Sequence, residues 1–487
     1  MTTRSDSTVM VAVRPLVILK YLGQLLLVLA ALATLPLAAS LVVGELDIGL
    51  RLGIVIGAML ILSVPMSRLP RSSQLQWNEA LTATALAFVI APIAMTFPLM
   101  GYGIPFVDAW FEAVSGTTTT GLSTLGGVEG RSAVFLFSRA WMQWYGGLGI
   151  AVLTIALVMR HHPSSKRLLE SSGEEAIAAT AGTHARRVFA VYVLLTLAGI
   201  LLVWAAQGDL FVSLIHALAA VSTGGFSGYD DSLAGLSAVS RVAILAACLL
   251  GAVGLPLYYQ TRRDGLRVLL NDPELRALLA ATLLVAVALA VLMGSVGGLS
   301  WDTALGEGIL LGASAQSTAG FSGMEVASLD PASKLTLIFS MFSGGCTGST
   351  AGGVKLVRVL ILLRLIQLAL RRTAAPARAV MSVGLGGQRL EPDVIANALL
   401  LLGLWVVVVA FSWFPFLLFG HEPLDALFEV VSAIGTVGLS SGISGPSLEP
   451  ALKLVLSLDM LFGRVEIIAL LVLLYPATWL GRRRTDP

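Results

Sequence analysis

The composition of this 487-residue chain is that of a membrane protein. Hydrophobic residues make up 56% of the chain and charged residues only 12%, whereas a soluble globular protein carries roughly 25% charged residues. The formal net charge of +2 is too small to indicate a nucleic-acid partner. The two cysteines, Cys248 and Cys346, have no CxxC or Cys/His neighbour, which excludes a recognisable metal cluster or disulfide framework.

Predominantly apolar stretches of membrane-spanning length follow one another along the chain. They cover residues 15–43, 49–67, 77–100, 132–159, 187–206, 236–260, 274–297, 332–371, 394–419 and 449–480. The first stretch is too long for the core of a signal peptide and is expected to be retained as a helix. The stretch 332–371 is too long for one crossing and contains a glycine-rich break, so its C-terminal end is expected to project into the cytosol.

The charges in the loops predict the orientation of the chain. One set of connections is basic and contains Arg68, Arg71, Arg160, Lys166, Arg167, Arg186, Arg187, Arg262, Arg263, Arg267, Arg371, Arg372 and Arg378, with Arg482–Arg484 in the tail. The alternate connections are acidic or neutral and contain Glu45, Asp47, Asp230, Asp231, Glu325, Asp330, Glu422 and Asp425. The positive-inside rule therefore predicts that the basic loops and both termini are cytoplasmic.

A short element, Thr-x-Gly-(Leu or Phe)-Ser, recurs four times and always lies in an outward-facing connection. The copies are residues 119–123, 223–227, 318–322 and 436–440. A semi-apolar segment of about a dozen residues, too short to span the membrane, precedes each copy: Asp108–Ser115, Leu210–Val221, Asp302–Ala315 and Asp425–Ser432. A single copy could be an ordinary turn, but four copies in equivalent positions predict a repeated unit of helix, re-entrant helix, loop and helix.

Non-helical backbone at membrane depth is tolerated only where it is buried in protein or lines a watery cavity. Four such loops around one axis would present rings of carbonyl oxygens, which can replace the hydration shell of a potassium ion. Glycine permits the backbone conformation and the close approach that such a ring requires. The predicted potassium-filter residues are Thr118, Thr119, Thr120, Gly121, Ser222, Thr223, Gly224, Gly225, Ser317, Thr318, Ala319, Gly320, Gly435, Thr436, Val437 and Gly438.

A second candidate site interrupts the helix that follows the third copy. Its residues are Gly344, Gly345, Cys346, Thr347, Gly348, Ser349, Thr350, Ala351, Gly352 and Gly353. Because each glycine costs about 1 kcal/mol against alanine in a helix, this run is expected to leave the helical conformation and to form a gate below the filter. A hinge of closely packed small residues is the alternative.

Arg464 lies in the middle of the last apolar stretch. An arginine at that depth costs roughly 2.5–3.5 kcal/mol on insertion scales, so it should face the interior and bind carbonyls or a carboxylate. Asp459 and Glu466 are possible partners. Lys355 and Arg358, by contrast, are expected to extend to the cytoplasmic boundary.

The chain is therefore predicted to be an all-α polytopic membrane protein with four pseudo-symmetric helix–pore-loop–helix repeats around one pore, preceded by two extra transmembrane helices. The predicted divisions are an N-terminal helix pair at 1–72 and pore repeats at 73–165, 166–265, 266–385 and 386–487, the third of which carries the gate loop.

Several stretches of this sequence resemble the TrkH/KtrB/HKT superfamily of potassium transporters, and most closely its TrkH branch. The resemblance is carried by Phe111–Ala113, Gln143–Ile150, Ser222–Ser227, Gly344–Lys355 and Leu461–Ile467. In this superfamily a glycine in the first filter implies a preference for potassium and a serine implies sodium; here the residue is Gly121. The segment Thr436–Leu439 looks more like the KtrB branch.

The resemblance implies potassium uptake through a gated pore, with K⁺ as the transported ion, no organic cofactor and no enzymatic activity. It implies that Arg464 contacts the glycine-rich loop and helps to close the path. It also implies a homodimer in a bacterial inner membrane and a cytoplasmic nucleotide-binding regulatory subunit, similar to TrkA, that docks on the basic inner surface.

Other transport functions remain possible at this stage. A sodium-permeable transporter, or one coupled to sodium or protons, would have the same fold. A carrier of small organic solutes would be expected to show two inverted halves with broken helices, which four parallel copies of one loop do not favour. An intramembrane enzyme would need paired carboxylates, histidines or a metal cluster at membrane depth, and no such spacing is present.

Overall fold

The computed structural model describes residues 12–70, 75–161, 174–376 and 381–480. Of the loop residues that predict the orientation, Arg71, Lys166, Arg167, Arg378 and the tail arginines lie outside the described residues. The chain divides into two compact units: unit 1 comprises residues 1–103 and 465–487, and unit 2 comprises residues 104–464.

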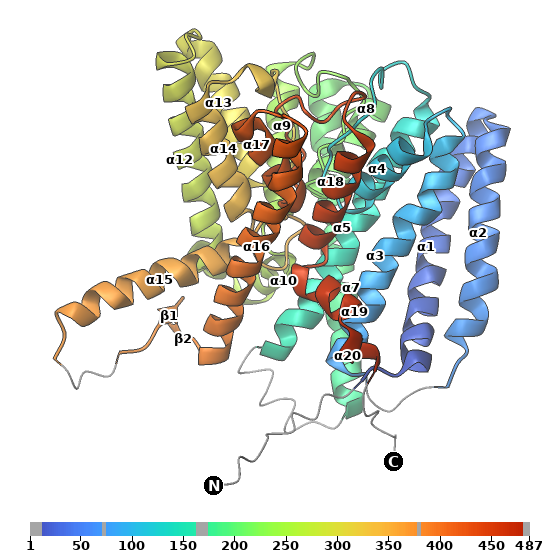
Figure 1. Cartoon of the computed structure of the whole chain (residues 1–487), viewed down its shortest axis with the longest axis horizontal. Helices are drawn as coiled ribbons and strands as arrows, with labels where there is room; N and C mark the ends of the chain where they lie inside the picture. The colour runs from blue at the N-terminus through green and yellow to red at the C-terminus, as the bar shows by residue number, and fades with distance from the viewer. Residues whose placement is uncertain (1–11, 71–74, 162–173, 377–380, 481–487) are drawn as a thin grey trace. The chain divides into compact units, whose positions relative to one another are not determined.

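Unit 1 is a group of apolar helices, namely α1 (Pro15–Val43), α2 (Leu46–Ser67), α3 (Trp77–Met100), α19 (Ile467–Leu474) and α20 (Pro476–Trp479). Gly44, at φ 87°, ends α1 with a hydrogen bond from its N–H to the carbonyl of Ser40, and α2 begins almost immediately. The helices α1 and α2 therefore form a tight hairpin, which also packs on α3 (Figure 1). The Arg14 guanidinium binds both carboxylate oxygens of Glu79, at 2.8 and 3.0 Å, and so joins the start of α1 to that of α3.

Unit 2 contains the remaining elements in chain order. They are α4 (Phe106–Thr117), α5 (Ala133–His161), α7 (Glu174–Gln207), α8 (Leu210–Val221), α9 (Ala238–Ala252), α10 (Leu255–Asp264), α11 (Leu266–Asn271), α12 (Pro273–Ser295), α13 (Trp301–Gln316), the 3₁₀ turn Val326–Ser328, α14 (Pro331–Ser343), α15 (Leu356–Thr373), the antiparallel strands β1 (Gly384–Leu385) and β2 (Gln388–Arg389), α16 (Pro392–Leu418), α17 (Pro423–Ile434) and α18 (Pro450–Arg464). The all-α class is confirmed.

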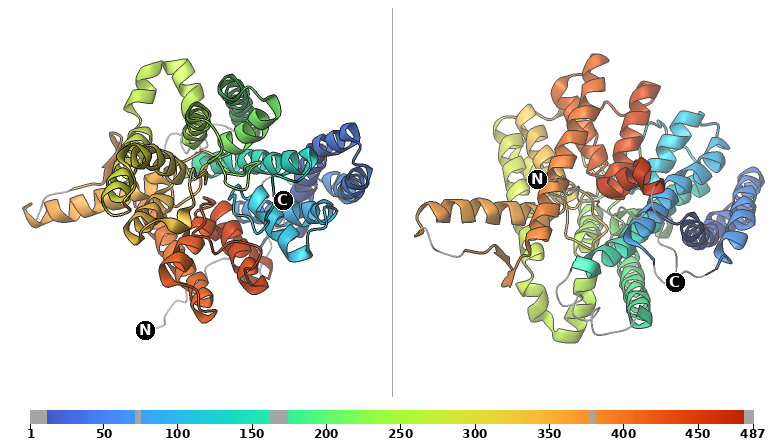
Figure 2. Two further views of the ribbon diagram at one scale, coloured as in Figure 1. Left: turned by 90° about the horizontal axis from the view of Figure 1, so that it is seen from above. Right: turned by 60° about the horizontal axis from the view of Figure 1, so that its bottom comes forward.

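The four short helices α4, α8, α13 and α17 correspond to the predicted re-entrant segments. Each packs against the helix that follows the preceding filter segment: α8 against α5, α13 against α9, α17 against α14 and, to complete the series, α4 against α18. Seen from above in Figure 2, the colours of unit 2 accordingly pass around a centre from cyan through green and yellow to red. The domain boundaries proposed from the sequence remain a prediction.

Three of the predicted apolar stretches are broken, and for two of them the break was not expected. The stretch 236–260 forms α9 and α10, which meet at 82°, because Pro256 near the start of α10 has no N–H with which to continue α9. The stretch 449–480 ends as α18 at Arg464, and Glu466 has a positive φ of 58°. The break expected in 332–371 separates α14 from α15, which extends outward from the rest of unit 2 (Figure 1).

Six helices in the described part of the chain are long and apolar enough to cross a membrane without a break. They are α1, α2, α3, residues Thr183–Gln207 of α7, α12 and α16, and the bent pair α9 and α10 would make a seventh crossing. Their exposed faces carry large apolar side chains, including Leu283 and Leu284 on α12 and Phe411 on α16. Apolar faces of this extent are unfavourable in water and mark surfaces that contact lipid or protein. The chain is therefore a multi-pass membrane protein.

Candidate functional site

The four Thr-x-Gly segments share one unusual backbone conformation. Their threonines have positive φ angles although they carry a branched side chain: Thr119 at 55°, Thr223 at 53°, Thr318 at 56° and Thr436 at 48°. The glycines also have positive φ angles: Gly121 at 92°, Gly225 at 76°, Gly320 at 75° and Gly438 at 97°. A left-handed non-glycine residue costs of order 1–3 kcal/mol and persists where the surroundings enforce it, most often at functional sites.

The first residue of each predicted filter quartet ends the preceding short helix. Thr118, Ser222, Ser317 and Gly435 are the C-cap residues of α4, α8, α13 and α17. The hydroxyls of Thr118, Ser222 and Ser317 donate to carbonyls one turn earlier in their own helices, at 2.7–2.8 Å. These hydroxyls are therefore occupied by the helix end, whereas the residues that follow them carry the unusual backbone.

The four segments meet around one point. A Cβ added to Gly121 would overlap the carbonyl oxygen of Gly224 in the second segment. In the same way Gly225 abuts the carbonyl of Ala319, Gly320 abuts that of Val437, and Gly438 abuts that of Thr120 in the first segment. The contacts run from the first segment to the fourth and back to the first, so the predicted filter residues come together in cyclic order. Each glycine is required because a side chain has no room there.

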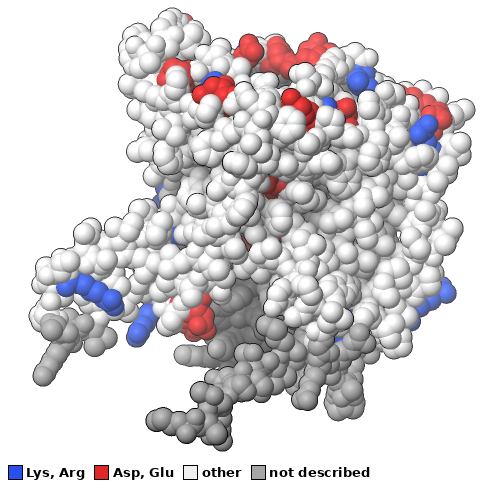
Figure 3. Space-filling model, in the orientation of Figure 1, with Lys and Arg blue, Asp and Glu red and all other residues white. Residues whose placement is uncertain are grey.

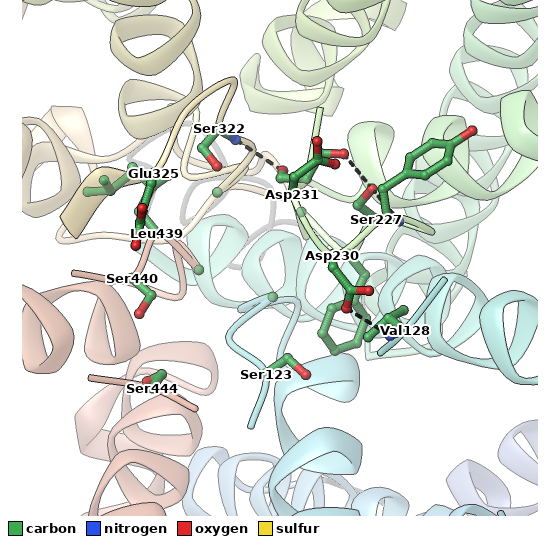
Figure 4. A pocket seen from close by; sticks show the side chains of 18 of the residues that line it. Ser123, Val128, Ser227, Asp230, Asp231, Ser322, Glu325, Leu439, Ser440 and Ser444 are labelled. Atoms are coloured by element: carbon green, nitrogen blue, oxygen red, sulfur yellow. Dashed lines mark hydrogen bonds between the residues drawn. The ribbon is translucent and has the colours of Figure 1, made fainter. Parts of the chain in front are cut away.

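All four glycines line one open cavity of about 600 Å³. Its wall also contains Asp230, Asp231 and Glu325, which are labelled in Figure 4. Acidic side chains gather along the upper edge of the molecule in Figure 3. Partial burial, together with the negative charges of Asp209, Glu129 and Asp231, raises the pKa of Tyr229, which lines the same cavity. The cavity is therefore negative, and it favours the approach of cations.

The second segment is supported from behind by α5. Gln143 donates from Nε2 to the carbonyl of Gly224 and accepts the N–H of Phe226 at 3.1 Å. Arg139 lies with its guanidinium carbon 3.9 Å from the centre of the Phe226 ring and donates to the carbonyl of Ser227 at 2.9 Å. These two buried side chains hold the second segment through its main chain.

Ion pairs connect three of the short helices, α4, α17 and α13, to the helices that pack against them. Lys453 of α18 binds Asp108 of α4 at 2.6 Å, Lys334 of α14 binds Asp425 of α17 at 2.6 Å, and Arg241 of α9 binds Glu307 of α13 at 2.9 Å. The last of these pairs is the most exposed of the three on its basic side, at 23%. Three of the four contacts between a short helix and its neighbouring helix therefore contain an ion pair, and the fourth is the packing of α8 against α5.

We expect the Lys453–Asp108 pair to contribute strongly to stability, because its side chains are only 5% and 17% exposed. Lys453→Met leaves Asp108 buried with the Thr124 hydroxyl as a remaining partner, and breaking a buried pair costs about 3–5 kcal/mol. Thermal unfolding of detergent-solubilised protein should therefore shift downward markedly. Adding Asp108→Asn to Lys453→Met should restore much of the loss, and equal losses in the single and double variants would contradict a role for the pair itself.

The glycine-rich loop between α14 and α15 is hydrogen-bonded to the Thr-x-Gly segments and to the ends of their short helices. The N–H of Gly352 donates to the Thr318 hydroxyl at 2.7 Å, and the N–H of Gly353 donates to the carbonyl of Gly435 at 2.9 Å. The Thr350 hydroxyl donates at 3.0 Å toward the carbonyls of Val221 and Gly251. The predicted gate residues therefore form an ordered irregular loop inside unit 2, with positive φ angles at Gly344, Gly348 and Gly353.

Arg464 reaches this loop from α18. Its side chain is buried, and it donates from one nitrogen to the carbonyl of Thr350 at 2.8 Å and from the other to the carbonyl of Gly146 at 3.0 Å. The expected carbonyl partners are therefore present. Asp459 is not a partner, since its Oδ1 accepts the Ser412 hydroxyl at 2.6 Å. Arg464 thus connects the gate loop to α5 through two main-chain oxygens.

The expectation that Lys355 reaches the cytoplasmic boundary is wrong. Lys355 is buried, and its ammonium donates to the carbonyl of Ala351 within the gate loop. In the first half of the loop, Glu274 of α12 accepts the N–H of Thr347 at 2.6 Å. The loop is therefore held by side chains from both directions, and the positive φ of 79° at Lys355 belongs to this irregular turn rather than to α15.

The sequence analysis assigned no supporting role to several residues that hold the Thr-x-Gly segments in place. Gln143 and Arg139 lie on α5, and Glu112, His216 and Glu429 lie on the short helices. The repeat contained a signal for the last three, because each stands eleven residues before the final serine of its segment. Gln143 lies in one of the stretches that resemble the superfamily, but no repeated spacing marks Gln143 or Arg139, which bind a segment of a different repeat.

The arrangement defines a polytopic membrane protein of the all-α class in which four loops converge on one another. The family model of the TrkH cation transport proteins matches residues 53–478, and the chain belongs to this family.

Its relatives support the same assignment. It is 31% identical to the Trk system potassium uptake protein TrkH of Escherichia coli K12 over 393 residues, covering 77% of this chain and 80% of the relative. It is 30% identical to the Trk system potassium uptake protein TrkI of Halomonas elongata, covering 95% and 96% of the two chains. The crystal structure of the potassium transporter TrkH from Vibrio parahaemolyticus matches with a TM-score of 0.85 at 25% identity, over 96% of this chain and all of that one. The predicted family is therefore confirmed, and its members are transport proteins rather than enzymes.

Proposed function

We propose that this protein takes up potassium across a bacterial inner membrane through a filter formed by the four Thr-x-Gly segments. The observation that carries this proposal is the cyclic contact of each filter glycine with a carbonyl of the next segment. Carbonyl oxygens brought so close around one axis can replace water around a monovalent cation. The names of the curated relatives, which are potassium uptake proteins, support potassium as the ion.

In this proposal the filter lies at the base of the negative cavity. Asp230, Asp231 and Glu325 raise the local concentration of cations. An ion then loses its water in front of Gly121, Gly225, Gly320 and Gly438. The protein needs no covalent chemistry and no organic cofactor for this step, because the main-chain dipoles are already oriented and need little reorganisation when the ion arrives.

The glycine-rich loop and Arg464 are proposed to close the path on the inner side of the filter. The loop binds three different filter segments or their helix ends through Thr318, Gly435 and Val221. Opening would require the loop to exchange these hydrogen bonds for others, and Arg464 would have to release the carbonyl of Thr350. The closed arrangement is therefore stabilised by a small number of identifiable bonds.

The remaining features of the proposal come from the charge pattern and the family. The basic loops and both termini are placed in the cytoplasm by the positive-inside rule. A homodimer, and a cytoplasmic nucleotide-binding subunit similar to TrkA that acts on the inner surface, complete the proposed assembly. Both would leave the filter itself within a single chain, since all four segments belong to unit 2.

The proposal is tested by measuring reversal potentials of the reconstituted wild-type protein with potassium on one side and sodium on the other. We expect a potential close to the potassium equilibrium value, and accumulation of potassium by a bacterial strain that lacks its own uptake systems. Vesicles without protein serve as the control. A wild-type protein whose reversal potential ignores the exchange of potassium for sodium would overturn the proposal.

A further inference from the structure

One side-chain hydrogen bond recurs at the final serine of three filter segments. In each case a buried side chain of the short helix reaches the hydroxyl of the serine eleven residues later. Glu112 accepts from Ser123 at 2.8 Å, Glu429 accepts from Ser440 at 2.5 Å, and Nε2 of His216 lies 3.0 Å from the Ser227 hydroxyl. Glu112, His216 and Glu429 are all completely inaccessible to solvent. A buried ionisable group at this depth requires such partners.

The third segment is built differently. Leu311 stands at the corresponding position, and Ser322 is held instead by the turn that follows the second segment. Its N–H donates to the Ser232 hydroxyl at 3.1 Å, and its carbonyl accepts the N–H of Leu233 at 2.9 Å. The Ser227 hydroxyl lies 2.8 Å from the carbonyl of the same Ser232. The support of the third segment therefore depends on the support of the second.

His216 is at the centre of this arrangement. Its Nδ1 lies 2.8 Å from the carbonyl of Val212. Because that oxygen can only accept, Nδ1 carries the hydrogen, and Nε2 of the neutral ring is an acceptor. It shares the single hydrogen of the Ser227 hydroxyl with the carbonyl of Ser232. The ring also packs against Phe321 of the third segment and Tyr229, with centroids 6.3 and 5.8 Å away. His216 thus touches a residue of the second filter segment and a residue of the third.

The first segment is connected to the same network. Glu112 accepts from Nε of Arg139 at 2.5 Å, and Arg139 donates from another nitrogen to the carbonyl of Ser227 at 2.9 Å. The path from Ser123 through Glu112 and Arg139 to Ser227, and from there to His216, is continuous. In the fourth segment Glu429 also accepts from the main chain and side chains of Ser441 and Ser444 at 2.7–3.3 Å. Each network lies behind the filter main chain.

We propose that Glu112, His216 and Glu429 are positioning residues for ion selectivity. They do not touch the ion. They hold the outer serine of each segment, and therefore the carbonyls before it, at a set distance from the centre, with His216 serving the second and third segments together. A filter can select by its size or by the number and strength of its carbonyl dipoles. In either case the carbonyls must not move inward to bind a smaller ion such as sodium. This inference rests on the proposed function.

The test replaces His216 by side chains that resemble those at the equivalent position of the other repeats. His216→Leu copies Leu311 of the third segment: it keeps the bulk but loses the bond to Ser227. His216→Gln restores a hydrogen-bond acceptor on a side chain of the same length as Glu112 and Glu429. The loss of one supporting hydrogen bond is expected to reduce the potassium-to-sodium permeability ratio about tenfold in His216→Leu, whereas His216→Gln should stay within about threefold of the wild type. His184→Leu, which removes the histidine bonded to Tyr259, is the matched control and should leave the ratio unchanged.

Ser227→Ala removes the other partner of the hydrogen bond with His216 and keeps the inference testable if His216→Leu does not fold. It should lower the ratio similarly, and the double variant should be no worse than either single variant, because both remove one interaction. A residue needed only for folding would instead reduce the yield of protein while leaving the reversal potential of the folded fraction unaltered. Folded His216→Leu and Ser227→Ala proteins with wild-type reversal potentials would overturn the inference. A wild-type protein without potassium preference would overturn the proposed function itself.

Discussion

Gly121→Ser should remove most of the preference for potassium over sodium. The left-handed φ of 92° at this residue is unfavourable for serine, and its Cβ would overlap the carbonyl oxygen of Gly224. That oxygen must then move away from the place where the proposed carbonyl ring requires it. We expect the permeability ratio measured from reversal potentials to fall at least about tenfold, which corresponds to about 1.4 kcal/mol of lost discrimination.

Gly127→Ser is a matched control for this substitution. Gly127 also has a positive φ, of 68°, and lies shortly after the first filter segment, but a Cβ there meets no atom within 4 Å. It therefore carries a comparable backbone strain without the collision. Equal losses of discrimination in both variants would indicate that strain in the loop, and not the displaced carbonyl, is responsible. A selective Gly121→Ser protein would argue against the filter.

Arg464→Met should increase potassium flux. The variant loses two hydrogen bonds from a charged group, to the carbonyls of Thr350 and Gly146, each worth roughly 1.5–3 kcal/mol in a buried site. If these bonds favour the closed loop, the ratio of open to closed protein should rise about a hundredfold. Deleting residues 345–352 should act in the same direction. The flux is measured as rubidium or potassium uptake into vesicles at equal amounts of folded protein.

Two comparisons make the gate prediction specific. Arg464→Lys keeps the charge but has one nitrogen, which cannot reach two carbonyls in the fixed geometry of a guanidinium, so an intermediate flux is expected. Arg364→Met removes an exposed arginine that binds Gln367 on α15 and should have no effect. Unchanged flux in both Arg464→Met and the loop deletion would leave the loop as a packing element and not a gate.

The sequence predicted the centre of this protein well because the signal there is repeated. One Thr-x-Gly element is uninformative, but four copies after short helices gave the location of α4, α8, α13 and α17 to within a few residues. The break between α14 and α15 was equally visible, because a run of glycines cannot form a stable helix. In both cases the information is local, and a few adjacent residues determine the backbone.

The supporting contacts could not be predicted in the same way. Lys453 and Asp108 are 345 residues apart, and Arg139 binds a carbonyl in another repeat. These pairs depend on the order in which the repeats follow one another around the centre, which an apolar pattern does not contain. The bend between α9 and α10 was missed for a different reason: hydrophobicity alone does not register that Pro256 interrupts a helix.

The closed series of contacts among the filter glycines has a consequence for variation in this protein. Every segment touches the next and the fourth touches the first, so no segment has a free side toward which it could relax. A larger residue at one junction must displace the carbonyl of the next segment, which in turn contacts the segment after it. Substitutions in different segments should consequently act on a shared distortion, and their combined effect should be smaller than the sum of the separate ones. How well the protein accepts a substitution in one Thr-x-Gly segment should then depend on all four segments together.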